Sequence, residues 1–181
     1  MGNFKFVNTE IKGVYIVETK VFGDNRGYFM ETYNYNDFKE AGLDMEFVQD
    51  NQSKSTKGVL RGLHFQKKHS QGKLVRVTKG KVFDVGVDLR DGSETHGKWV
   101  GVMLSEENKK QFYLPKGFAH GFLVLSDEAE FCYKCTDFYH PEDEGGLIWN
   151  DTHINIKWPL SGIDKIVFSE KDKHWPSLKD I

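Results

Sequence analysis

Two histidines stand in segments that would aim an imidazole ring into a protein interior. His120 comes three residues after the Pro-x-Gly turn at Pro115–Gly117, and His64 lies in the strand-like run Val59–Gln66. A rigid turn that leads into a strand fixes the direction of the ring that follows. Histidine titrates near neutral pH, so His64 is a candidate general base. The competing interpretation of either residue is a structural histidine with its hydrogen bonds satisfied.

The surroundings of these histidines disfavour a metal centre. Pro115–Phe122 resembles the second sequence motif of the cupin barrels, and Arg61–Gln66 stands where the first motif would supply His-x-His and a downstream glutamate. Only one histidine is present there, and Gln66 and Lys73 stand roughly where further ligands are expected. An ammonium group repels a divalent cation. We therefore expect a site without metal, in which acid–base groups occupy the positions of the metal ligands.

Lysine and tyrosine side chains supply the other groups that proton transfer next to a carbonyl needs. Lys73 is the first residue of the strand-like run Lys73–Val77. Tyr133 and Tyr139 are the first and last residues of a second short segment, Tyr133–Tyr139. An inward ammonium in a dry cavity would stabilise an enolate oxygen far better than it could in water. A phenol near that lysine is a workable proton donor. The alternatives are a solvated lysine and core aromatic residues.

Residues suited to an anionic nucleotide occur nearer the N-terminus. Arg26 lies in the turn Asp24–Phe29 beside aromatic residues, and Gln49 and Asn51 place carboxamides on an otherwise apolar strand. The arginine fork can donate two hydrogen bonds to a phosphate, and carboxamides match the mixed donor and acceptor edge of a base. Such residues are also common in loops and edge strands.

The elements that would position these groups are strands. Short runs rich in valine, phenylalanine, tyrosine and leucine recur about every dozen residues, which favours a sandwich or barrel over alternating β-α units. The expected strands are 13–21, 28–33, 47–53, 58–66, 73–78, 81–89, 98–104, 111–114, 119–125 and 130–136. Only Asn36–Ala41 and the C-terminal end have a helical pattern.

Alternation within these strands has consequences for single residues. In Val82–Leu89 it places Asp84, Gly86 and Asp88 on one face and a core on the other. Strict alternation would separate Arg61 from His64, unless a bulge at Gly62 brings them to one face.

Cys132 and Cys135 form a lone Cys-x-x-Cys. Within a strand, side chains three residues apart point to opposite faces, so we interpret both as structural thiols and not as a redox pair or half of a zinc site.

Length and charge restrict the class of protein. The chain has 181 residues with a 38% hydrophobic share, which predicts one domain over residues 1–181. A formal net charge of −2 gives no support for bulk binding to nucleic acid or to an anionic membrane. The sequence has no apolar run of membrane-spanning length and no signal-peptide pattern, so we expect a cytoplasmic protein without nucleic-acid or membrane partners.

Longer motifs resemble one known family, the dTDP-4-dehydrorhamnose 3,5-epimerases of dTDP-L-rhamnose biosynthesis. The resemblance extends from about Val14 to Asp172 and is strongest at Asp24–Gly27, Gly58–Gln66, Gly80–Arg90, Pro115–Phe122 and Trp149–Asp151. It implies an all-β, cupin-type double-stranded β-helix (a jelly-roll barrel) with short peripheral helices. It also implies a homodimer that exchanges N-terminal strands, and a cofactor-independent isomerase acting on dTDP-4-keto-6-deoxyglucose.

The resemblance assigns roles by motif. His64 resembles the base that removes the C5 and C3 protons, Asp172 the acid that orients it, Lys73 the group beside the enolate oxygen, and Tyr133 the proton donor. Tyr139 resembles the residue that stacks on thymine. The remaining residues that the family places near the substrate correspond to Arg26, Phe29, Glu31, Gln49, Asn51, Arg61, His120, Glu144 and Lys171.

Three other functions remain open at this stage. A related enzyme could invert only C3 or only C5, or prefer another deoxysugar, and shared motifs do not separate these. A metal-dependent cupin with His64 and His120 as ligands would bind iron, manganese or zinc. Stable sites for these metals usually have three protein ligands, and this one would have two. A binding module without turnover would leave His64, Lys73 and Tyr133 together by accident.

Overall fold

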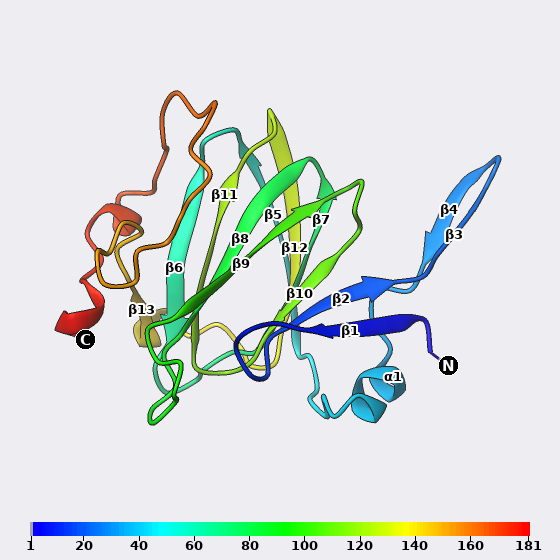
Figure 1. Ribbon diagram of the computed structural model, residues 1–181, viewed down its shortest axis with the longest axis horizontal. Helices are drawn as coiled ribbons and strands as arrows, with labels where there is room; N and C mark the ends of the chain where they lie inside the picture. Colours follow the sequence, from blue (N-terminus) through cyan, green and yellow to red (C-terminus); the bar gives the residue numbers. More distant parts are fainter. Residues whose placement is uncertain (1) are drawn as a thin grey trace.

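Two antiparallel β-sheets face each other in the computed structural model, which describes residues 2–181 (Figure 1). The first sheet has the order β1 (Phe4–Asn8), β2 (Tyr15–Thr19), β10 (Gln111–Leu114), β7 (Lys73–Lys79), β12 (Glu128–Cys135) and β5 (Gln49–Thr56). The second has the order β13 (Glu144–Gly146), β6 (Leu60–Gln66), β11 (Phe118–Val124), β8 (Lys81–Asp88) and β9 (Trp99–Ser105). The all-β prediction is confirmed.

A separate hairpin, β3 (Val21–Asp24) and β4 (Gly27–Met30), projects from the side of the molecule (Figure 1). Its aromatic residues are uncovered: Phe29 is 66% exposed and Tyr28 is 62% exposed. Monomeric proteins seldom leave such residues together in water, which points to a contact with another surface.

The predicted strands correspond to elements of the structure within a few residues, with three additions. The sequence did not indicate β1 or β13, and it merged β3 into the strand before it. β13 has the sequence Glu-Gly-Gly, which has no preference for a strand. It is a strand because Glu144 to Gly146 pair with β6.

The space between the sheets is filled by apolar side chains from both. β7, β10 and β12 contribute from one sheet, and β8, β9 and β11 contribute from the other. The fully or nearly fully buried members include Val75, Phe112, Phe131, Val82, Leu104 and Val124. This layer holds the two sheets together and leaves the polar site at one end of the barrel.

The expectation that β8 has one core face is incomplete, because both of its faces are buried. Val82 packs between the sheets, whereas Val85 and Val87 pack outside against Leu147 and Ile154. The segment after β13 covers this outer face. Asp84 and Asp88 lie on the other face, the one that carries Val82, and both are fully buried there.

The single α-helix, α1 (Tyr35–Glu40), lies one residue from its expected position. The side chain of Asn34 caps it by accepting hydrogen bonds from the backbone of Asn36 and Asp37. Phe38 anchors it against Val17. The helical C-terminal end consists of two short 3-10 turns, Lys171–Lys173 and Leu178–Asp180.

Two further expectations concern cysteines and membranes. Cys132 and Cys135 are free thiols, the first half-buried and the second buried. Within residues 2–181, no helix combines the length and apolar character that crossing a bilayer requires.

Candidate active site

A cavity of about 260 Å³ opens between strands β5, β6, β7 and β12. Its volume lies below the range of about 300–1,000 Å³ that is typical of small-molecule sites, so a larger ligand must extend beyond it. The lining contains seven of the residues expected from the sequence. The full lining is Gln49, Asn51, His64, Phe65, Gln66, Gln71, Lys73, Tyr133, Tyr139 and Glu144.

A β-bulge in β6 brings Arg61 to the same face as His64. On the neighbouring strand, His120 pairs with His64 while Phe122 pairs with Arg61, so β6 has one extra residue between these pairs. Gly62 has a φ of +117°, and a Cβ there would lie 2.6 Å from the Cα of Gly121. The bulge therefore requires glycine, and Nε of Arg61 donates to Ser55 Oγ at 3.1 Å.

His64 and Asp172 form a hydrogen-bonded pair at the edge of the cavity. Nε2 of His64 lies 2.5 Å from Oδ1 of Asp172, which also accepts a hydrogen bond from Trp175 Nε1 at 3.2 Å. Burial opposes ionisation of Asp172, yet the hydrogen bonds and charge of its neighbours outweigh this and lower its pKa. The ionised carboxylate accepts the Nε2 proton, which leaves Nδ1 of His64 with a free lone pair.

Lys73 brings a positive charge to the same cavity. Burial lowers the pKa of its ammonium, and the charges of Cys135 and Asp84 act in the opposite direction. Within residues 2–181, no carboxylate lies within 4 Å of its Nζ. A cation that is not already paired is available to a developing negative charge on a ligand.

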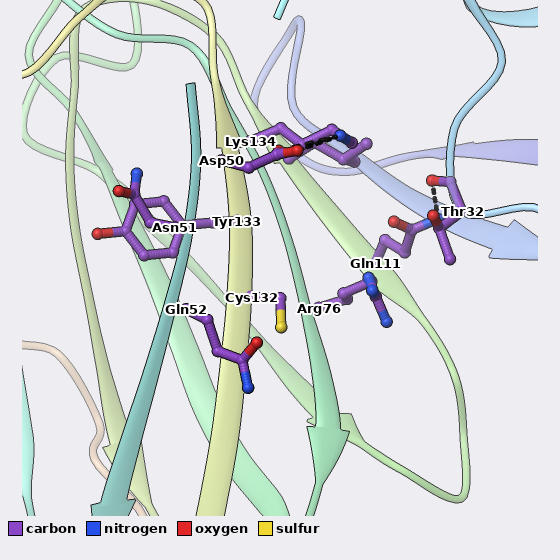
Figure 2. A pocket seen from close by; sticks show the side chains of 10 residues that line it. Thr32, Asp50, Asn51, Gln52, Arg76, Gln111, Cys132, Tyr133 and Lys134 are labelled. Carbon is purple, nitrogen blue, oxygen red and sulfur yellow. Dashed lines mark hydrogen bonds and ion pairs between the residues drawn. The ribbon is translucent and has the colours of Figure 1, made fainter. Parts of the chain in front are cut away.

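Tyr133 adds a phenol to the lining of the same cavity. It pairs with Asn51 between β12 and β5, and Figure 2 shows both side chains on the side of these strands away from Cys132 and Arg76. Burial is the main reason that the pKa of Tyr133 is raised. The phenol therefore keeps its proton at neutral pH and can act as an acid.

Asp84 is a site residue that the sequence analysis did not single out. Both of its carboxylate oxygens lie 3.0 Å from Nε2 of His120, and Asp84 is fully buried. Burial raises the pKa of Asp84, whereas the charge and hydrogen bond of His120 and the charge of Lys73 act to lower it. The sequence does show Asp84 in an alternating strand. A carboxylate at a position that alternation directs inward is the signal that could have identified it as a site residue.

Gln66 stands where a cupin metal ligand was expected, and its carboxamide is fully used by the backbone. Nε2 donates to the carbonyls of His69 at 2.7 Å and Phe138 at 3.0 Å, and Oε1 accepts from the backbone of His140 at 2.7 Å. The group ties two loops together at the mouth of the cavity.

The mouth itself is polar. Tyr139 donates from its hydroxyl to Glu144 Oε2 at 3.1 Å and from its backbone to Gln49 Oε1 at 2.9 Å. Glu144 also forms an ion pair with Lys171, and Gln49 donates to Asn51 at 3.0 Å. The structure thus brings the expected polar residues of the mouth together.

The structure does not bring Arg26, Phe29 and Glu31 to this cavity. Arg26 and Phe29 lie on the projecting hairpin, where Arg26 pairs with Asp24. Glu31 follows β4 and accepts hydrogen bonds from Asn3 and Asn34.

The two sheets and their cavity define a cupin-type barrel, with an imidazole, a phenol and an ammonium group around one space. The family model described as dTDP-4-dehydrorhamnose 3,5-epimerase matches residues 8–180. The chain therefore belongs to the dTDP-4-dehydrorhamnose 3,5-epimerase family.

Individual relatives agree with this assignment. The dTDP-4-dehydrorhamnose 3,5-epimerase of Methanothermobacter thermautotrophicus is 54% identical over 99% of this chain and 97% of its own length. That of Shigella flexneri is 59% identical over 92% of this chain and 91% of its own. A crystal structure of a dTDP-6-deoxy-D-glucose-3,5-epimerase from Legionella pneumophila, in complex with dTDP-4-keto-L-rhamnose, superposes with a TM-score of 0.95 at 51% identity, covering 98% of this chain and 94% of that one. The cupin-type fold is confirmed.

Proposed function

We propose that this chain is a dTDP-4-dehydrorhamnose 3,5-epimerase that inverts C3 and C5 of dTDP-4-keto-6-deoxyglucose in dTDP-L-rhamnose biosynthesis. Both carbons lie next to the C4 ketone, so their protons are acidic enough to be removed by a side chain. The observation that carries the proposal is one cavity lined by His64, Lys73 and Tyr133, with Asp172 bonded to His64.

The proposed mechanism gives each group one task. Nδ1 of His64 removes the proton, while Asp172 holds the ring and stabilises the imidazolium that forms. Lys73 stabilises the negative charge that develops on the C4 oxygen. Tyr133 delivers a proton to the opposite face of the carbon, which inverts it.

The proposal includes no metal and no cofactor, because the adjacent ketone supplies the acidity that a Lewis acid would otherwise provide. The nucleotide would extend from the cavity over the mouth. Tyr139 would stack on the thymine, and Gln49, Asn51, Glu144, Lys171 and His120 would surround the ligand. Arg61 and Arg26 would supply cations for the two phosphates.

Solvent deuterium incorporation followed by NMR tests this function. Metal-stripped protein is expected to exchange both C3 and C5 protons of dTDP-4-keto-6-deoxyglucose, and His64→Ala is expected to abolish exchange. His96→Ala, which changes an exposed histidine away from the cavity, serves as the control. Exchange at one carbon would indicate a single-centre epimerase, and exchange only with added metal would favour a metal-dependent cupin.

The projecting hairpin supports a further part of the proposal, a homodimer in which Arg26, Phe29 and Glu31 serve the partner's cavity. The exposure of Phe29 and its distance from the cavity lining both favour this arrangement. The single domain over residues 1–181 and the cytoplasmic location stay predictions.

Complementation between inactive variants tests the exchange. His64→Ala and Arg26→Ala are each expected to be inactive, and a mixed dimer would contain one site with both residues intact. Unfolding and refolding an equal mixture should therefore restore about a quarter of the parental activity. Arg26 acting in its own subunit would leave every site of the mixture defective, and no activity would return.

A further inference from the structure

Beside the catalytic cavity, two loops bring two histidines and an aspartate together. His69 lies between β6 and β7, and Asp137 and His140 follow β12. One potential ligand atom from each of the three residues lies within 4.8 Å of the other two. The rings of His69 and His140 stack, with centroids 3.9 Å apart and 16° between their planes.

We propose that His69, Asp137 and His140 form a binding site for one divalent transition-metal ion, of which Zn²⁺ fits best, outside the catalytic cavity. Imidazole nitrogen and carboxylate oxygen are preferred zinc ligands, and three protein ligands leave one position of a tetrahedron for water. The proposal goes beyond the epimerase function and does not depend on it.

The backbone that carries these ligands is already fixed. The carboxamide of Gln66 holds the carbonyl of His69 and the backbone N–H of His140 at 2.7 Å each. On the other side, the carboxylate of Asp143 accepts hydrogen bonds from the backbone of Lys68 and His69. Because both loops are held before any ion arrives, binding has to order only side chains.

A second layer of acceptors and donors orients two of the ligands. Nδ1 of His140 lies 3.2 Å from Oε1 of Glu142, which leaves Nε2 for an ion. Oδ1 of Asp137 accepts the backbone N–H of Phe138 at 2.9 Å, which leaves Oδ2. A carboxylate on the remote nitrogen of a ligating histidine is a usual feature of metal sites, because it fixes the ring and raises its basicity.

Two features must change when the ion binds. Ligands of a tetrahedral zinc ion lie about 3.3 Å apart for metal–nitrogen distances near 2.0–2.1 Å, whereas the present atoms are known to lie within 4.8 Å of one another. The ring of His69 is exposed and stacks on His140, so it has to turn from this stacked position when it binds the ion. Lys116 Nζ lies 3.4 Å from Oδ2 of Asp137, but both groups are partly in water, so the pair is weak and an ion can displace it.

Cobalt binding provides the direct test, because tetrahedral Co²⁺ absorbs visible light and occupies zinc sites. Protein without a polyhistidine tag, stripped with a chelator, is titrated with Co²⁺ and, by calorimetry, with Zn²⁺. We expect one equivalent to bind, and His69→Ala and His140→Ala each to weaken binding by roughly tenfold or more. Asp137→Asn should weaken it as well.

Two controls separate this site from other histidines. His96→Ala should bind like the parent protein, because His96 lies outside the cluster. His64→Asn should also bind like the parent protein, whereas loss of binding there would place the ion in the barrel and overturn the proposal. Absence of saturable binding, or equal binding by the His69 and His140 variants, would overturn it too.

Thermal unfolding gives an independent measurement. A ligand that binds only the folded state raises its stability, so Zn²⁺ should raise the Tm of the parent and of His96→Ala. The same ion should leave the Tm of His140→Ala unchanged. An equal rise in all three would mean that the ion acts elsewhere.

Discussion

Nε2 of His64 lies 2.5 Å from Oδ1 of Asp172, although the two residues are 108 positions apart in the sequence. His64 lies on strand β6, and Asp172 lies in a 3-10 turn near the C-terminus. Ser169 supports this turn, because its hydroxyl accepts the backbone N–H of Asp172 at 3.2 Å. The C-terminal segment thus supplies the partner of the histidine that we propose as the base.

Asp172→Asn should lower kcat by roughly 100-fold or more while KM changes little. The amide can donate to the ring where the carboxylate accepts, which favours the wrong tautomer of His64 for proton removal. Steady-state kinetics with the keto sugar measure the effect. Trp175→Phe removes the other donor to Asp172 Oδ1 and should cost less than about tenfold. Equal losses in the two variants would contradict a specific role for the carboxylate.

Tyr133→Phe should separate proton removal from proton return. His64 and Lys73 remain, so solvent deuterium should still enter at the carbons next to the ketone, while formation of inverted product falls by roughly 100-fold or more. NMR of the recovered sugar distinguishes exchange with retention from inversion.

The phenylalanine variant keeps the ring that packs against Phe131, so the fold should be preserved. Loss of exchange together with inversion would instead make Tyr133 a structural residue. Normal inversion would assign the proton donor to another group.

Motifs and alternation predicted the residues that lie on regular strands. The sequence left Lys73 as an inward or a solvated lysine and Tyr133 as a proton donor or a core aromatic, and the family resemblance placed both near the substrate. The structure has both in the cavity lining with His64. At Gly62 the structure has the bulge that the sequence analysis left open, and not strict alternation. Spacing could not decide between the two, because the bulge depends on the close approach of β11 to β6.

The spacing of residues along the sequence could not predict which distant segments cover a given strand. The expectation of one core face on β8 did not reveal that the other face also lies inside the molecule, and so Asp84 was missed. That face is buried because it turns toward the other sheet, whereas the chain after β13 covers the face of Val85 and Val87. No local pattern reports either contact. Arg26 was interpreted as a cation near phosphate, but its place on a projecting hairpin depends on assembly.

The same Asp-x-Arg pairing occurs twice in the molecule, once buried and once exposed. Asp88 is fully buried and accepts hydrogen bonds from Arg90, Ser93 and Thr95, with Nη2 of Arg90 at 2.6 Å from Oδ2. Asp24 makes the corresponding contacts with Arg26 at the surface. Burial disfavours the charge of Asp88, but the hydrogen bonds outweigh it and hold the pKa of Asp88 well below its ordinary value.

Asp88→Asn should reduce the free energy of unfolding at neutral pH by about 3–5 kcal/mol, because Arg90 loses a buried partner. A depressed pKa contributes stability above the unfolded value of about 4, and this contribution is lost as pH falls through the folded value. The difference in the free energy of unfolding between Asp88→Asn and the parent, measured by urea unfolding, should therefore be smaller at pH 3 than at neutral pH. Asp24→Asn should change stability little at either pH. A difference that is constant with pH would mean that shape, and not charge, determines the effect.

Asp84→Asn should move the alkaline limb of the pH–activity profile to lower pH. Burial already lowers the pKa of Lys73, and the charge of Asp84 is one of the influences that raise it. Removing that charge lowers the pKa of Lys73 further, so the ammonium that stabilises the enolate oxygen is lost at a lower pH. At neutral pH, kcat should fall by less than the roughly 100- to 1,000-fold that loss of an oxyanion donor costs.

Cys135→Ala provides the matched comparison for this prediction. Cys135 also raises the pKa of Lys73 when ionised, but burial raises the pKa of its own thiol, so it is neutral at working pH. Its removal should leave the alkaline limb in place. A similar displacement in both variants would indicate altered packing around Lys73, and an unmoved limb in Asp84→Asn would mean that Lys73 does not control it. A displaced limb in Asp84→Asn alone is the result that an electrostatic role for Asp84 requires.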